Sequence, residues 1–121
     1  MKRIIHDLIE FHFNPCLLGT KYLEKGIVYK IRDKDLKYME LYEKIAKDFN
    51  TNYKCVEKNI RKAIRYGFDN TTPDLVEKFL LNFRSNHYNH NVLDFKDYEK
   101  NSIFIELFSL YIQNTVFSLI F

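Results

Sequence analysis

The order of apolar and polar positions predicts a chain built from helices. Apolar residues recur three and four positions apart in six segments, at 3–12, about 16–30, 36–49, 53–66, 73–83 and from about 101 onward. Alternating runs rich in Val, Ile and Thr are absent, and the sequence holds only three glycines and two prolines. The pattern therefore predicts an all-α fold of about six helices in one domain, residues 1–121.

Segment 36–66 carries the most informative pattern. It predicts two helices, at about 36–49 and 53–66, joined by a tight turn at 49–52 in which Asn52 is suited to cap the second helix. Along one stripe of that second helix lie the cations Lys54, Lys58, Arg61 and Arg65. Its opposite side is apolar and small. Such a helix can pack on a core and enter a DNA major groove at once, so the segment predicts a helix-turn-helix.

The net charge of +3 is unevenly distributed. Residues 21–66 hold 13 Lys and Arg against 7 Asp and Glu, a net charge of +6, whereas residues 67–121 hold 4 against 7, a net charge of −3. A basic middle favours a polyanionic partner. A solvated helical surface would give the same distribution, so the charge indicates DNA only because it coincides with the two-helix segment.

No residue set typical of an enzyme or of a metal site is present in the sequence. Paired carboxylates, a glycine-rich phosphate loop and a nucleophile–base constellation are all missing. His87 and His90 have one-turn spacing, but no Cys or carboxylate set accompanies them, so we expect a polar loop there. The sequence predicts neither catalysis nor a cofactor. Cys16 and Cys55 are too few for a disulfide framework.

The C-terminal segment 103–121 is apolar enough to be compared with a membrane anchor. It contains Glu106, Gln113 and Asn114 and has no basic flank after it, which makes it a poor spanning helix. The N-terminus lacks the uninterrupted apolar stretch of a signal peptide. We therefore expect a cytoplasmic protein without a membrane partner.

The helix-turn-helix segment resembles one family closely. It reads Ile45-Ala46-Lys47-x-Phe49-Asn50-Thr51 and then Val56-Glu57-x-x-Ile60-Arg61-x-Ala63-Ile64. This pattern is similar to the effector domain of the stage-zero sporulation response regulator of Bacillus and Clostridium. Further similarities at 4–8 and 101–105 extend the resemblance over nearly the whole chain. The resemblance implies a six-helix fold whose helix 53–66 reads a box with a G·C-bearing core in AT-rich promoters, often as head-to-tail pairs of domains.

The resemblance also implies roles for individual residues. Glu57 and Arg61 match DNA-contacting positions unchanged, and Lys58 stands where the family has arginine. We expect these three to read bases, with Arg61 donating to a guanine. Phosphate contacts are expected from the turn and from both helices, namely from Lys47, Thr51, Asn52, Lys54, Lys62 and Arg65. Lysine lacks the planar fork of arginine, so the departures from the family bear on the target sequence.

The first hypothesis is therefore a sequence-specific DNA-binding transcriptional regulator. The sequence begins where the family's effector domain begins and shows no receiver domain, so we expect it to act alone. Its apolar C-terminal segment 116–121 would complete the core or form a self-association surface. A second hypothesis is a protein-interaction module that antagonises a full-length relative or binds a sigma subunit of RNA polymerase. A plasmid or phage DNA-binding accessory role fits the sequence equally well.

Overall fold

The computed structural model describes residues 4, 7–9, 12–72, 74 and 100–120, the last seven of these by their backbone alone. These residues form helices joined by turns and contain no strand, which confirms the predicted all-α class. Four helices have complete bounds: α2, Leu18–Arg32; α3, Tyr38–Asp48; α4, Tyr53–Asn70; and α6, Asn101–Ile120. The predicted helix at 73–83 and the predicted loop with His87 and His90 lie outside the described residues.

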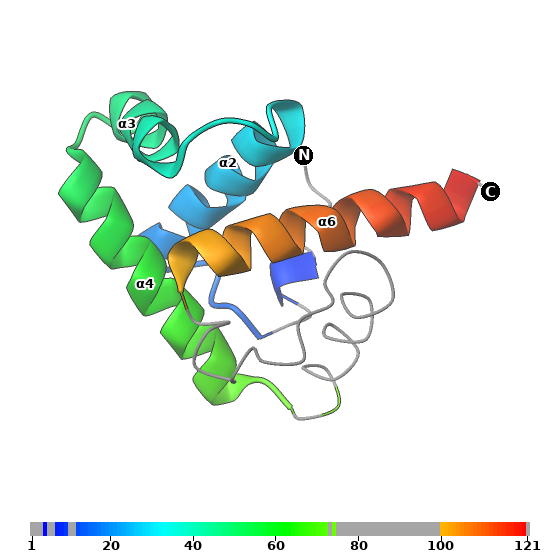
Figure 1. Ribbon diagram of the computed structural model, residues 1–121. Helices are drawn as coiled ribbons and strands as arrows, with labels where there is room; N and C mark the ends of the chain where they lie inside the picture. Colours follow the sequence, from blue (N-terminus) through cyan, green and yellow to red (C-terminus); the bar gives the residue numbers. More distant parts are fainter. Residues whose placement is uncertain (1–3, 5–6, 10–11, 73, 75–99, 121) are drawn as a thin grey trace.

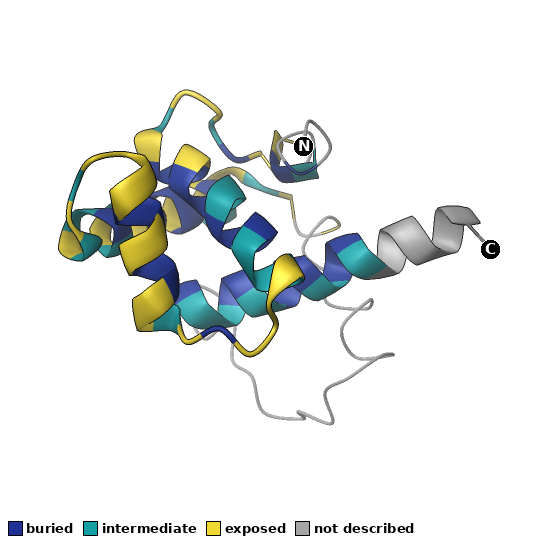
Figure 2. Ribbon diagram, turned by 90° about the horizontal axis from the view of Figure 1, so that it is seen from above, coloured by how far each residue is buried: buried dark blue, intermediate teal, exposed yellow. Residues whose placement is uncertain are grey.

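Helix α2 is the central element of the described part of the chain. It contacts α3, α4 and α6, and α4 also contacts α3 and α6. Figure 1 shows α3 and α4 meeting at one corner of the molecule, with α6 crossing in front of α2. Helices α2, α3 and α4 turn buried residues toward the other helices and exposed residues outward, whereas residues 101–113 of α6 are all buried or half-buried (Figure 2). The most completely buried side chains come from all four helices and from the segment before α2: Ile4, Leu8, Leu23, Ile27, Leu41, Ile45, Val56, Ile60, Ile64, Ile105 and Phe108.

Helix α4 continues four residues beyond its predicted end at 66, through Gly67 to Asn70. Gly67 is buried because the ring of Phe13 packs directly on it: a Cβ added to Gly67 would lie 2.5 Å from that ring. Phe13 also contacts Phe104 of α6, with ring centroids 5.2 Å apart. Gly67 therefore makes room for the segment before α2 and does not end the helix.

The helices of the described part do not include a membrane-crossing segment, since none combines the necessary length with sufficient apolarity. No group of three or more potential metal-binding side chains occurs among the described residues. Cys16 and Cys55 are both free thiols.

Candidate nucleic-acid interface

The turn between α3 and α4 is held by local backbone hydrogen bonds. Asn50 adopts a left-handed backbone conformation with φ of 54°. The N–H of Thr51 donates to the carbonyl of Ala46 at 2.9 Å, and the N–H of Asn50 donates to Lys47 at 3.4 Å. These two bonds form a Schellman motif, and asparagine is the residue other than glycine that most readily takes its left-handed position. The path of the chain into α4 is therefore fixed by residues 46–51.

Two tyrosines of α2 contact the end of α3 next to this turn. Tyr22 packs edge-on against Phe49, with ring centroids 4.9 Å apart. About two turns further along α2, the hydroxyl of Tyr29 donates to the carboxylate of Asp48 at the end of α3. This hydrogen bond, together with partial burial, raises the pKa of Tyr29 above its ordinary value. The end of α3 is thus attached to α2 through two adjacent residues, Asp48 and Phe49, just before the chain turns.

The start of α4 is a capped but uncompensated helix N-terminus. As predicted, Asn52 is the N-cap: its Oδ1 accepts from the N–H of Cys55 at 2.9 Å. The first turn contains no acidic residue, whereas Lys54 lies there and is exposed. A cation is unfavourable at the positive end of the helix dipole, so both the dipole and the lysine favour an approaching anion.

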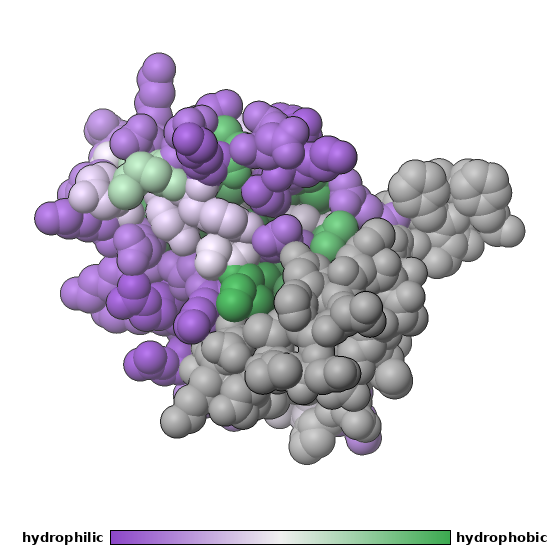
Figure 3. Space-filling view, in the orientation of Figure 1, coloured by the Kyte–Doolittle hydropathy of each residue, from purple (hydrophilic) through white to green (hydrophobic). Residues whose placement is uncertain are grey.

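The two sides of α4 differ completely in exposure. Val56, Ile60, Ala63 and Ile64 are at most 1% exposed and form its inner side. The outer side carries five exposed cations: Lys54, Lys58, Arg61, Lys62 and Arg65. Figure 3 shows hydrophilic side chains gathered over the part of the surface that α3 and α4 occupy. The core packing therefore fixes which side of α4 is available to a partner.

Two of the predicted base-reading residues contact each other directly. Nη2 of Arg61 donates to Oε1 of Glu57 at 2.8 Å, with side chains that are 56% and 38% exposed. An exposed pair at this i, i+4 spacing contributes only about 0.3–0.5 kcal/mol to stability. Its larger effect is geometric, because it holds the guanidinium of Arg61 along the outer side of α4.

Comparison with protein-family models matches residues 3–112 to the family described as "Sporulation initiation factor Spo0A C terminal". The chain belongs to this family. The Spo0A C-terminal domain is a DNA-binding domain of a sporulation regulator and not an enzyme class, and the match agrees with the resemblance seen in the sequence. A comparison with curated proteins found no match. DNA binding in transcription regulation is thus the function that membership of the Spo0A C-terminal family supports.

Within this Spo0A-type domain, the predicted phosphate-contacting residues occupy two places. Lys47, Thr51 and Asn52 lie at or beside the turn, where Lys47 and Asn52 are exposed and Thr51 is half-buried. Lys54, Lys62 and Arg65 are all exposed on α4. The side-chain oxygen of Asn52 is occupied by the cap, which leaves its amide nitrogen as the group able to donate to a phosphate.

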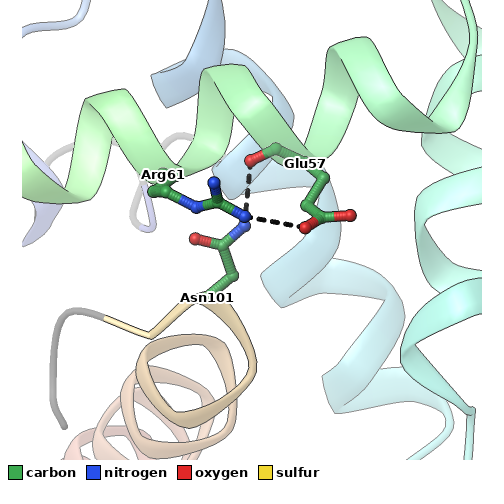
Figure 4. A network of polar contacts seen from close by, with 3 residues as sticks. All are labelled: Glu57, Arg61 and Asn101. Carbon is green, nitrogen blue, oxygen red and sulfur yellow. Dashed lines mark hydrogen bonds and ion pairs between the residues drawn. The ribbon is translucent and has the colours of Figure 1, made fainter.

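Sequence reasoning missed two residues that lie beside the predicted base-reading positions. Asn101, the first residue of α6, donates from Nδ2 to the backbone carbonyl of Glu57 at 2.9 Å (Figure 4). Tyr42 of α3 is buried, which raises the pKa of its phenol; the adjacent Asn101 and Arg61 act to lower that pKa, and Glu57 acts to raise it. The sequence pattern around these residues does not predict either contact, because the partners come from different helices.

Proposed function

We propose that this chain is a sequence-specific DNA-binding transcriptional regulator in which α3, the turn at 49–52 and α4 act as a helix-turn-helix. The observation that carries the proposal is the division of α4 into an apolar side sealed in the core and an outer side with five exposed cations. A helix held this way presents long charged side chains to the major groove without disturbing the core. Family membership supports the same reading.

The proposal divides the contacts into two kinds. Glu57, Lys58 and Arg61 read base edges: Arg61 donates to guanine O6 and N7, and Glu57 accepts from a cytosine amino group or orients Arg61. The other contacts position the domain on phosphates, and they come from Lys47, Thr51, Asn52, Lys54, Lys62 and Arg65. A regulator of this kind acts in the cytoplasm, and contact with a sigma subunit of RNA polymerase would follow DNA binding.

Self-association through α6 is the second part of the proposal. The helix runs to Ile120, and its last turns contain Val116, Phe117, Leu119 and Ile120. Paired domains on DNA would gain affinity from such a contact. Sedimentation of the chain and of a Phe117→Glu variant measures it directly: we expect a concentration-dependent dimer that the substitution abolishes. Monomers of both proteins at every concentration would contradict this part alone.

The test of DNA reading starts with selection of bound duplexes from a random pool. The selected duplex and a scrambled duplex of the same composition are then titrated across a salt series. We expect the selected duplex to bind about 10³-fold more tightly, with log–log salt slopes of several units for both duplexes. Equal, weak binding to both would contradict sequence reading. It would favour the interaction module, which a pull-down with a sigma subunit in the absence of DNA would then detect.

A further inference from the structure

The first turn of α6 is joined to α4 at the residue pair that faces the groove in the proposed function. Asn101 is 8% exposed, and its amide reaches across 44 residues of sequence to the carbonyl of Glu57. The side chain of the same Glu57 accepts from Arg61. Figure 4 shows the three residues, with Asn101 directed from the start of α6 toward α4. The backbone of Glu57 is therefore held by Asn101 of α6, and its side chain is held by Arg61 of α4.

The Asn101 contact is a poor device for stability alone. Its Oδ1 is buried and has no hydrogen-bond partner among the described residues. An unsatisfied buried acceptor opposes folding, whereas an apolar side chain of similar size would avoid that cost. An apolar residue could not form the directional hydrogen bond that Asn101 makes to the carbonyl of Glu57 in α4, nor the hydrogen bond by which Asn101 lowers the pKa of Tyr42 in α3.

Directionality matters at this place because the buried side chains of α4 on either side of Glu57 are apolar. A hydrogen bond from His12 to the carbonyl of Asn70 lies at the far end of the helix. Val56, Ile60 and Ile64 seal the inner side of the helix, and apolar contacts tolerate small rotations and shifts along the axis. A side-chain hydrogen bond with a donor–acceptor distance of 2.9 Å tolerates much less. Recognition of a base edge requires a side chain placed to within about 0.5 Å.

We propose that Asn101 is a positioning residue for base recognition: it fixes the rotation and axial height of α4 at Glu57, and through Glu57 it sets where the guanidinium of Arg61 meets a base. The inference rests on the proposed function. It assigns α6 a part in sequence reading that is separate from any contact with DNA, because Asn101 itself is buried beneath the pair.

The experiment compares variants on two duplexes. One is the selected duplex, and the other carries an A·T pair in place of the G·C pair whose preference is lost in Arg61→Ala. Asn101→Leu keeps roughly the size of the side chain, removes the donor and adds no charge, and Asn101→Ser is the second variant, too short to reach Glu57. Ser109→Ala is the matched control, since Ser109 is a buried polar residue of α6 that donates to Ile105 within its own helix.

We expect Asn101→Leu and Asn101→Ser to reduce the preference for the G·C duplex about 5- to 10-fold, with an unchanged salt slope and unchanged binding to scrambled DNA. Ser109→Ala should leave the preference intact. In an Arg61→Ala background the Asn101 substitutions should have no further effect on the preference, because they act through Arg61.

Three results would overturn the inference. Equal losses of affinity on all duplexes would show that Asn101 has a merely structural role. Effects that add to those of Arg61→Ala would show that Asn101 acts independently of Arg61. An unchanged preference for the G·C duplex would show that Asn101 has no role in base recognition. A wild-type chain that prefers its selected duplex keeps the proposed function in each of these cases. A wild-type chain without any preference would overturn both proposals together.

Discussion

Gly19 of α2 lies directly against the carbonyl oxygen of Asn59 in α4. A Cβ added to Gly19 would lie 1.9 Å from that oxygen and 3.0 Å from the Cβ of Ala63. Backbone against backbone is the closest approach that two helices make, and it leaves no side chain that could move aside. The contact sets the distance between α2 and the helix whose outer side carries the cations.

Gly19→Ala should therefore destabilise the domain, despite the higher helix propensity of alanine, by about 1–3 kcal/mol because α2 and α4 must separate. Urea unfolding followed by circular dichroism measures the difference. Gly26→Ala is the matched control in the same helix: its Cβ would lie 3.3 Å from the flexible ends of Ile45 and Leu41. Equal midpoints for the two variants would show that the approach at Asn59 is not tight.

Asn50 should be replaceable by glycine but not by a β-branched residue. Its φ of 54° lies in the left-handed region, where valine is strained by about 1–2 kcal/mol and glycine is not. We expect Asn50→Val to lower the thermal midpoint clearly and Asn50→Gly to leave it nearly unchanged. The turn would have another conformation if both variants melted at the same temperature.

Replacing Lys54 should affect stability and DNA binding in opposite directions. A cation in the first turn opposes the helix dipole, so Lys54→Ala should leave stability unchanged or raise it by about 0.3–1 kcal/mol. The same variant should bind selected and scrambled duplexes more weakly, with a salt slope lower by about 1. Lys34→Ala, in the exposed connection between α2 and α3, is the control. A Lys54 variant that binds like this control would remove Lys54 from the interface.

Tyr42 should make stability depend on alkaline pH. Burial raises the folded-state pKa of its phenol above the ordinary 10.0, so the unfolded chain releases this proton first as pH rises. Its contribution is complete below pH 10 and is lost as pH rises through the raised folded-state value. Unfolding free energies between pH 8 and pH 11 should therefore fall less steeply for Tyr42→Phe than for wild type. Parallel curves would show that Tyr42 titrates alike in both states.

The turn and α4 were predictable because their signals are local. Asn52 caps the helix that begins at the next residue by accepting from the N–H of Cys55, and the apolar period through Val56 and Ile60 fixes which side is buried. The spacing of Glu57 and Arg61 likewise brings their side chains together in any helix. Local rules suffice wherever the partners lie within one turn of each other.

Contacts between distant segments were not predictable from the pattern. The pattern predicts the end of α4 at 66, but Phe13 packs on Gly67 and the helix continues to Asn70. The hydrogen bond from Asn101 to Glu57 joins residues 44 positions apart, and the sequence around neither residue predicts it. The resemblance to the family predicts which helix reads DNA but does not indicate which contacts hold that helix in place.

The most direct test of the account is a duplex in which the guanine assigned to Arg61 is replaced by 7-deazaguanine. This base keeps its pairing but loses the N7 acceptor in the major groove. We expect wild type to bind the substituted duplex about 10-fold more weakly and Arg61→Ala to bind both duplexes equally. Wild-type binding that ignores the substitution, or an Arg61→Ala variant that remains sensitive to it, would contradict major-groove reading by α4.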